Sequence, residues 1–473
     1  MQVMLILPEL VLIVTVLVLF AASLKKIQGA SLTSMALGGS FLTLVATLFS
    51  CCASGTIFAG AYQVDGLSQL IKFLLSGGLF LVFFMCRGLS GIEEDMQNEF
   101  YLFLSFSTLG LVMMSSAVEL LTILVCLEIS SYALYVVISF RRGEGRRSEV
   151  EAGIKYVLFG AAATGISLFG LSYIFGLTHT TYLNEISAQL PKMMSQPMAV
   201  IGMVLMLCSF FYKLAMFPMH AWTPDIYQGA SNETTTFIAT LPKIGAAALL
   251  IRLVSMTGTG ITEFTWVLVI LAVLSMTFGN LAALVQDDIK RLLAYSSIAH
   301  AGYMMIGLLS GTQLGLAAVL YYIAGYVLMN LACFLVVYHI APRGENITFA
   351  DLKGLYRRSP ILAFTLAAGA FGMAGIPPTV GFTGKFVIFT AALEKGFYGL
   401  VVIAMVNAAV SAFYYLKMAR AVYCQGEEGE AEILQLGFGV KIFGAFLVIA
   451  IILVGIMPQG LMNLADQAVA ALL

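Results

Sequence analysis

About fourteen apolar runs follow one another along the chain, each close to the roughly 20 residues that an α-helix needs to cross a bilayer. The runs lie near residues 3–23, 31–53, 67–87, 100–118, 119–140, 151–177, 198–217, 235–256, 263–285, 294–311, 314–341, 361–391, 399–423 and 439–459. Only 10% of the 473 residues are charged, whereas a soluble domain has about 25%. Because so few charges cannot cover a water-exposed surface of this size, we predict an all-α polytopic membrane protein that forms a single membrane domain over residues 1–473.

The remaining composition excludes several functions. The formal net charge of -1 lacks the basic excess of a nucleic-acid-binding protein. The 7 cysteines include no CxxC pair and no cluster with histidine, so we expect them to pack as small apolar side chains. The chain also has no dinucleotide-binding glycine motif, no P-loop and no cysteine set for an iron–sulfur cluster. We therefore expect no metal or cofactor in this chain, and any energy for pumping must come from an ion gradient or from partner subunits.

Basic residues concentrate in alternate connections, which predicts how the chain is oriented in the membrane. They follow the first, fifth, ninth and eleventh runs, as Lys25, Lys26, Arg141, Arg142, Arg146, Arg147, Lys290, Arg291, Arg343, Lys353, Arg357 and Arg358. The other connections are poor in Lys and Arg, with Lys192 as an exception. An even number of spans with these connections in the cytoplasm places both termini on the periplasmic side. The first run has no basic segment before it, so we expect a retained helix rather than a cleaved signal peptide.

Two segments combine helix-breaking prolines with an isolated lysine in an apolar run. One extends from Lys213 through Pro218 and Pro224 to Asp225, with a half-helix expected near 224–235. The other extends from Gly375 through Pro377 and Pro378 to Lys385. Paired broken helices at corresponding places are typical of transporters built from two repeated halves with an ion site between half-helices, although ordinary proline kinks are the alternative. The sequence thus predicts two repeated five-helix halves, over 100–256 and 263–423, each with a broken helix.

Four ionisable residues lie alone in the middle of apolar runs: Glu128, Lys213, Lys243 and Lys385. A charge at such a position costs about 2.5–3.5 kcal/mol even on the lower insertion scales. Structural ion pairs would be one reason to keep them, but three lysines cannot all pair with one glutamate. Buried lysines release their proton readily because desolvation disfavours the charged form. A row of such groups across a membrane therefore indicates a proton path.

Three further residues leave two interpretations open. Lys155 follows Glu151 by four residues, so the two can pair on one turn of a helix, or Lys155 can belong to the proton path. His300 can carry protons or can be a hydrogen-bonded core residue. Glu119 stands at a span boundary, where a structural or interface acid is the more ordinary role.

Three long motifs resemble the antiporter-like, proton-translocating membrane subunits of respiratory complex I, whose relatives occur in multisubunit cation/proton antiporters and membrane-bound hydrogenases. The motifs are Leu-Pro-Lys243-Ile-Gly-Ala, Phe217-Pro-Met-His-Ala-Trp-Thr-Pro-Asp-Ile-Tyr-Gln-Gly-Ala230 and Asp288-Ile-Lys-Arg-Leu-Leu-Ala-Tyr-Ser-Ser-Ile-Ala-His-Ala-Gly302. Within this family the chain is most similar to the subunit N group. It has that group's Cys-Leu-Glu128-Ile-Ser-Ser motif, a lysine at 385 where the subunit M group has glutamate, and no long lateral helix after the last span.

The resemblance implies a function and a role for each residue. Glu128 and Lys213 would form the ion pair of a first half-channel, Lys243 would be central, and Lys385 would lie on the exit side. The chain would pump protons in the bacterial inner membrane beside other membrane subunits, including related antiporter-like ones. Partner subunits would hold NADH, flavin, iron–sulfur clusters and quinone. A cation/proton antiporter or membrane-bound hydrogenase subunit is the alternative, and a membrane scaffold without transport is a third possibility.

Overall fold

The computed structural model describes residues 2–142, 146–258, 260, 262–424, 433–470 and 472. The side chains of residues 2 and 146–148 lie outside this description, and with them the predicted cytoplasmic arginines Arg146 and Arg147.

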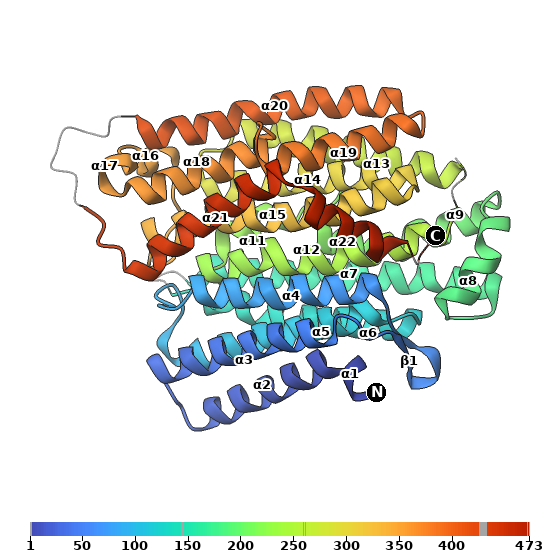
Figure 1. The fold of residues 1–473 in the computed structure, drawn as a ribbon, viewed down its shortest axis with the longest axis horizontal. Helices are drawn as coiled ribbons and strands as arrows, with labels where there is room; N and C mark the ends of the chain where they lie inside the picture. The colour runs from blue at the N-terminus through green and yellow to red at the C-terminus, as the bar shows by residue number, and fades with distance from the viewer. Residues whose placement is uncertain are drawn as a thin grey trace.

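The first layer of the bundle contains three spans. After the short α1 (Gln2–Leu5) come α2 (Leu7–Leu24), α3 (Ala30–Ser50) and α4 (Gly66–Met85). An antiparallel hairpin, β1 (Gly55–Ile57) and β2 (Tyr62–Val64) with η1 (Phe58–Gly60) between them, connects α3 to α4. In Figure 1, α2 and α3 form one edge of the molecule, where α2 packs on α5 and α3 packs on α4.

Two series of five spans follow. The first contains α5 (Gln97–Ser116), α6 (Leu120–Val137), α7 (Arg146–Thr178), α9 (Pro197–Met206) continued by α10 (Cys208–Leu214), and α12 (Asn232–Ser255). The second contains α13 (Glu263–Leu284), α14 (Ile289–Ser310), α15 (Gln313–Ile340), α18 (Pro360–Ala374) with α19 (Val380–Glu394), and α20 (Tyr398–Tyr423). The chain ends with α21 (Phe438–Ile456) and α22 (Gln459–Val469). Short connecting helices are η2 (Glu94–Met96), η3 (Ile138–Phe140), α8 (Leu183–Gln189), η4 (Leu190–Lys192), α11 (Thr223–Gly229), α16 (Phe349–Leu352) and α17 (Leu355–Arg358).

The predicted spans are confirmed. Among the described residues, 13 helices are long and apolar enough to cross a membrane. The remaining predicted run, 361–391, consists of the two shorter helices α18 and α19. The half-helix expected near 224–235 is shorter than predicted, because Ala230 and Ser231 are extended and the Ser231 side chain caps α12 through the N–H of Thr234.

The two broken helices end in the same way. Ala215 (φ 62°) caps α10 and Gly375 (φ 82°) caps α18, both in the left-handed conformation that commonly stops a helix. In each case the next N–H bonds to the carbonyl five residues earlier, from Met216 to Phe211 at 2.8 Å and from Ile376 to Phe371 at 3.0 Å. A cis X–Pro bond follows each cap, at Phe217–Pro218 and at Pro377–Pro378.

Helix α12 is the centre of the bundle. It is buried along its whole length, and α14 and α15, which pack against it, are almost completely buried. In contrast, α2, α20 and α21 expose many apolar side chains, including Leu17, Val406 and Ile449. An apolar outer surface of this size is stable only against lipid or another apolar partner.

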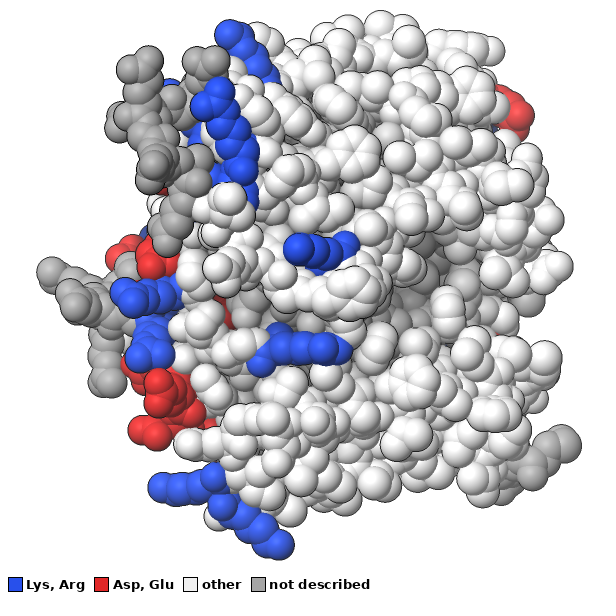
Figure 2. Space-filling view, turned by 60° about the vertical axis from the view of Figure 1, so that its left-hand side comes forward, with Lys and Arg blue, Asp and Glu red and all other residues white. Residues whose placement is uncertain are grey.

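The two ends of the bundle differ in charge. In Figure 1 the α2–α3 connection, α16 and α17 lie at one end, and both chain termini, the hairpin and α8 lie at the other. Figure 2 shows most of the Lys, Arg, Asp and Glu side chains of the visible face along the edge that belongs to the first of these ends, while the rest of that face is almost uncharged. We call these the basic end and the terminal end.

Candidate functional site

Three predicted lysines form a buried series across the interior. Lys243 stands near the middle of α12 and is 0% exposed, Lys213 lies in α10 and is 2% exposed, and Lys385 lies in α19 and is 5% exposed. None of the three forms an ion pair with a carboxylate within 4.0 Å among the described residues.

Two of these ammonium groups bind helix ends instead. Lys243 Nζ donates to the carbonyl of Leu214, the last residue of α10, at 3.2 Å. Lys385 Nζ donates to the carbonyls of Met373 and Ala374, at the end of α18, at 2.8 and 3.2 Å. The last carbonyls of a helix have no partner within it and carry partial negative charge. The carbonyls at the end of α10 and of α18 therefore each stabilise a lysine ammonium group through their partial negative charge, without a full negative charge.

His300 occupies the space between Lys243 and Lys385. It is 1% exposed on α14, and its Nδ1 and Nε2 lie 2.6 Å from the Tyr322 hydroxyl and 3.0 Å from the Tyr415 hydroxyl. Its ring lies 5.2 Å from that of Tyr326, which faces Lys243 Nζ at 5.8 Å. Lys385 Nζ lies 4.9 Å from the Tyr303 ring. This position is compatible with both interpretations of His300. The residue is hydrogen-bonded within the core, and the charges of both lysines act on it.

The implied ion pair between Glu128 and Lys213 is not formed in this structure. Glu128, which is half-buried on α6, accepts a hydrogen bond from Thr164 of α7. Lys213 Nζ has no hydrogen-bond partner among the described residues, although the Glu128 charge is near enough to act on it. The resemblance identified two groups close enough to act on each other electrostatically, but neither motif contains the threonine that binds the carboxylate.

Lys155 belongs to a solvent-accessible network at the basic end. It pairs with Glu151 at 2.8 Å, as its spacing predicted, and also with Asp225 at 2.7 Å. Asp225 in turn binds Arg291 at 2.9 Å. Burial alone would raise the pKa of Asp225, but hydrogen bonds from Lys155 and Arg291 hold that pKa below its ordinary value. Lys155 is therefore not part of the buried series itself.

Glu119 has a structural role. Its carboxylate caps α6 by accepting the N–H groups of Leu121 at 3.2 Å and Thr122 at 2.7 Å. Burial would raise its pKa, but these bonds and those from threonine hydroxyls lower the pKa of Glu119 below the ordinary value. The expectation of a structural acid at a span boundary agrees with this geometry.

Sequence reasoning missed several buried ionisable groups. Lys72 of α4, which is 0% exposed, binds Glu9 at 2.6 Å, and Arg252 binds Asp65 at 2.7 Å. Lys72 is a lone lysine in an apolar run, the same signal that identified Lys243. Lys290 was assigned to a cytoplasmic connection, but it is 0% exposed in the first turn of α14, because Asp288 caps that helix earlier than the apolar run indicates.

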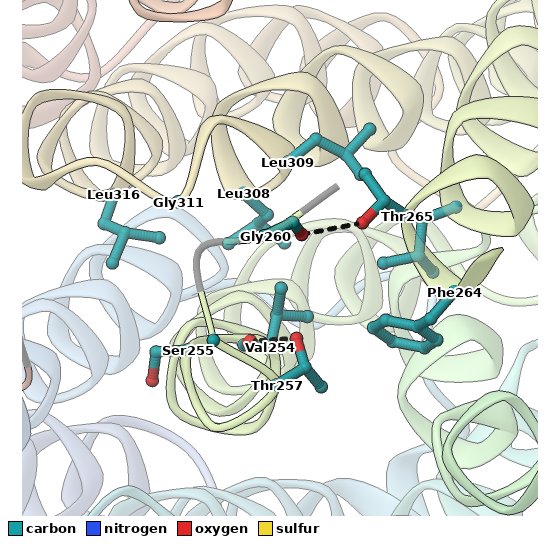
Figure 3. Close-up of a pocket in the computed structure, with 12 residues that line it drawn as sticks. Val254, Ser255, Thr257, Gly260, Phe264, Thr265, Leu308, Leu309, Gly311 and Leu316 are labelled. Carbon is teal, nitrogen blue, oxygen red and sulfur yellow. Dashed lines mark hydrogen bonds between the residues drawn. The ribbon is translucent and has the colours of Figure 1, made fainter. Parts of the chain in front are cut away.

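A small, partly open hollow lies away from the lysine series, where α12 ends and α13 begins (Figure 3). Val254, Phe264 and Leu309 contribute apolar side chains to it, and Thr265 donates to the carbonyl of Gly260 at 3.4 Å across its side. No described residue that lines it is ionisable. The described lining of this hollow therefore has no acid or base that could hold a proton during transfer.

Known proteins match this chain over nearly its full length. Residues 117–411 match the family described as NADH:quinone oxidoreductase/Mrp antiporter, transmembrane. The chain is 46% identical over 468 residues to NADH-quinone oxidoreductase subunit N 2 of Solidesulfovibrio magneticus, covering 98% of each chain, and 42% identical over 469 residues to that of Opitutus terrae, again covering 98% of each.

Solved structures agree with the sequence matches. A chain of respiratory complex I from Thermus thermophilus superposes with a TM-score of 0.85 at 32% identity, covering 97% of this chain and 99% of that one. A chain of the Mrp complex from Dietzia sp. shares the fold, with a TM-score of 0.87 at 19% identity over 100% of this chain and 98% of that one. The chain therefore belongs to the NADH:quinone oxidoreductase/Mrp antiporter transmembrane family, in the group of the subunit N relatives.

Proposed function

We propose that this chain is a proton-translocating membrane subunit of an NADH:quinone oxidoreductase and that protons cross it along Lys213, Lys243, His300 and Lys385. The observation that carries this proposal is Lys243, which is fully buried at the centre of the bundle and bound to a helix-end carbonyl. A carbonyl dipole stabilises the ammonium less than a carboxylate does, so both protonation states are accessible to the lysine.

The relatives favour this function over the alternatives. Curated relatives that are 46% and 42% identical are subunit N of NADH-quinone oxidoreductase, whereas the Mrp chain at 19% identity supports the fold alone. Partner subunits hold NADH, flavin, iron–sulfur clusters and quinone. The exposed apolar faces of α2 and α20 suit lipid and related antiporter-like subunits.

We assign the basic end to the cytoplasm of a bacterium and both termini to the periplasm, because Lys and Arg concentrate in cytoplasmic connections. The residues 100–256 and 263–423 are the two repeated halves, and the matching helix ends at Ala215 and Gly375 support this division.

Coupling begins at Glu128. When Glu128 leaves Thr164 and approaches Lys213, its negative charge favours the ammonium form, and its withdrawal releases the proton. The proton then passes to Lys243, whose carbonyl partner is adjacent to Lys213 in sequence, and through the His300 hydrogen bonds toward Lys385. Moving one proton against 100 mV costs about 2.3 kcal/mol, which a change in one buried charge interaction can supply.

Replacement of Lys243 tests this function. We expect Lys243→Ala to assemble into the complex and lose most proton pumping in membrane vesicles, normalised to the amount of complex. Lys243→Arg should fail as well, because a guanidinium does not release its proton near neutral pH. If both variants pump like the parent, Lys243 has only a structural role and the proposed proton path is wrong.

A further inference from the structure

Two buried ionisable groups at the basic end lie outside the proposed path. Glu233, in the first turn of α12, and Lys290, in the first turn of α14, are both 0% exposed. Lys290 Nζ donates at 3.0 Å to the carbonyl of Ala230, the residue that follows α11. This is the same kind of contact that Lys243 and Lys385 make, an ammonium group on the carbonyls at a helix end.

The fold leaves space for the Glu233 carboxylate. Its Oε1 accepts the N–H of Gly91 at 3.0 Å, and its Oε2 is buried with no hydrogen-bond partner among the described residues. A Cβ at residue 91 would lie 2.6 Å from Oε2, so a side chain there would displace the carboxylate from its present position. A buried carboxylate oxygen without a partner is costly, which indicates a group kept for its chemistry.

Glu233 and Lys290 repeat the relationship of Glu128 and Lys213. Each charge is near enough to act on the other, but no ion pair within 4.0 Å joins them among the described residues. Other charged groups act on Lys290 as well, namely Arg141, Asp288 and Glu345. The pair is therefore a buried acid and base that can exchange protons without first separating a tight salt bridge.

An open hollow at the basic end lies beside the end of α11. Its lining includes Arg141, Gln228 and Gly229, but neither Glu233 nor Lys290. Arg141 Nη1 donates to the carbonyls of Gln228 and Gly229 at 2.8 and 3.2 Å, and the next carbonyl, that of Ala230, binds Lys290. Three consecutive carbonyls thus join the arginine at the solvent side to the buried lysine.

A line of polar side chains on α12 leads from Glu233 to Lys243. Thr236 and Thr240 follow at spacings of three and four residues, and Lys243 comes three residues later, so the four lie on one helix face about 15 Å long. Both hydroxyls are 0% exposed and donate at 2.7 Å to the backbone, to the carbonyls of Asn232 and Thr236. Their lone pairs can still accept a further hydrogen bond.

We propose that Glu233 is the proton-loading group that supplies Lys243 from the basic end, with Lys290 beside it. This inference rests on the proposed function. The Glu233 carboxylate takes a proton that enters with water from the basic end and becomes the neutral acid. The proton then moves over Thr236, Thr240 and intervening water to the neutral amine of Lys243, which becomes an ammonium group while Glu233 returns to the carboxylate.

The test measures pumping per assembled complex in membrane vesicles for Glu233→Gln, Glu233→Asp and the control Glu94→Gln. Glu94 is an exposed carboxylate at the same end, paired with Arg142. We expect Glu233→Gln to lower the rate at least roughly tenfold. Glu233→Asp should keep part of the rate because it retains an acid, and Glu94→Gln should pump like the parent. Parent-like pumping by assembled Glu233→Gln would overturn the inference.

If Glu233→Gln does not assemble, a second pair of variants tests the inference. Thr240→Val keeps the side-chain volume on the polar face, while Thr235→Val makes the same change at a buried position on a different face of α12. Lower pumping in Thr240→Val alone supports the path, and equal pumping in both variants overturns it. Loss of pumping in Lys243→Ala together with normal pumping in the Glu233 and Thr240 variants would remove the loading group but keep the proposed function.

Discussion

The ammonium group of Lys243 on α12 donates to the carbonyl of Leu214, the last residue of α10, at 3.2 Å. Leu214 is adjacent to Lys213 in the sequence, so the break after α10 places the residue that follows Lys213 against the side chain of Lys243. Lys385 has the same kind of partner at the end of α18. The helix breaks therefore supply the partners of two buried lysines, because only a helix that stops inside the bundle presents free carbonyls there.

Glu128→Gln should depress proton pumping while the complex assembles normally, because the neutral amide cannot favour the charged form of Lys213. Glu128→Asp should have a milder effect, since the charge is retained on a shorter side chain. The measurement is pumping in vesicles per assembled complex. Normal pumping by an assembled Glu128→Gln complex would remove this residue from the mechanism.

Thr164→Val tests the position of Glu128 directly. Loss of the hydroxyl removes the hydrogen bond that holds the carboxylate on the α7 side, so Glu128 should move closer to Lys213. We expect slower pumping with assembly unchanged, because the lysine would then hold its proton longer. A pumping rate equal to that of the parent would show that the hydrogen bond has no part in coupling.

Gly375→Ala should destabilise the chain by about 1 kcal/mol from its positive φ alone. The new Cβ would also lie 3.1 Å from Cδ of Lys385 and crowd it, so pumping should fall as well. Ala215→Gly is the matched change at the other break and should stabilise the chain by about 1 kcal/mol or less. Thermal unfolding of the full chain in detergent measures both effects, and a stabilised Gly375→Ala variant would contradict this account.

The network of Lys155, Asp225 and Arg291 should not weaken between pH 8 and pH 5. The folded-state pKa of Asp225 lies below its ordinary value, so its stabilising contribution is present above the ordinary pKa and is lost only as the pH falls through the folded-state pKa. Asp225→Asn should therefore lower stability by at most about 1 kcal/mol at pH 7, since the pair is partly exposed. The difference from the parent should stay constant down to pH 5 and begin to shrink only below about pH 4. Thermal unfolding at several pH values checks this, and a difference that already disappears at pH 6 would be inconsistent with it.

Cysteine labelling tests the orientation. Cys51 and Cys52 are exposed and follow α3, so both are first replaced by serine to remove the background. Gln28→Cys at the basic end should then resist a membrane-impermeant thiol reagent added outside sealed cells, while Ser195→Cys near the start of α9 should react. The opposite result would reverse the assigned topology. Labelling at Gly143 would be a third test, although that residue lies outside the described ones.

Much of the architecture could be predicted because apolar length and charge position are local properties of a membrane-spanning chain. The spans, the broken helices and the lone lysines Lys213, Lys243 and Lys385 were all identified from the sequence. Every unpaired backbone group in a bilayer is costly, so a run of about 20 apolar residues has few alternatives to a helix.

The contacts of those residues depended on tertiary structure. No spacing indicates that Lys243 meets the end of α10, or that Thr164 rather than Lys213 holds Glu128. Lys290 was assigned to a loop and Lys72 was overlooked, because the burial of a charged residue near a span boundary depends on which helices pack over it. The sequence by itself determined which groups are expensive to place in a membrane, whereas packing between distant helices decided which dipole, hydroxyl or charge each group meets.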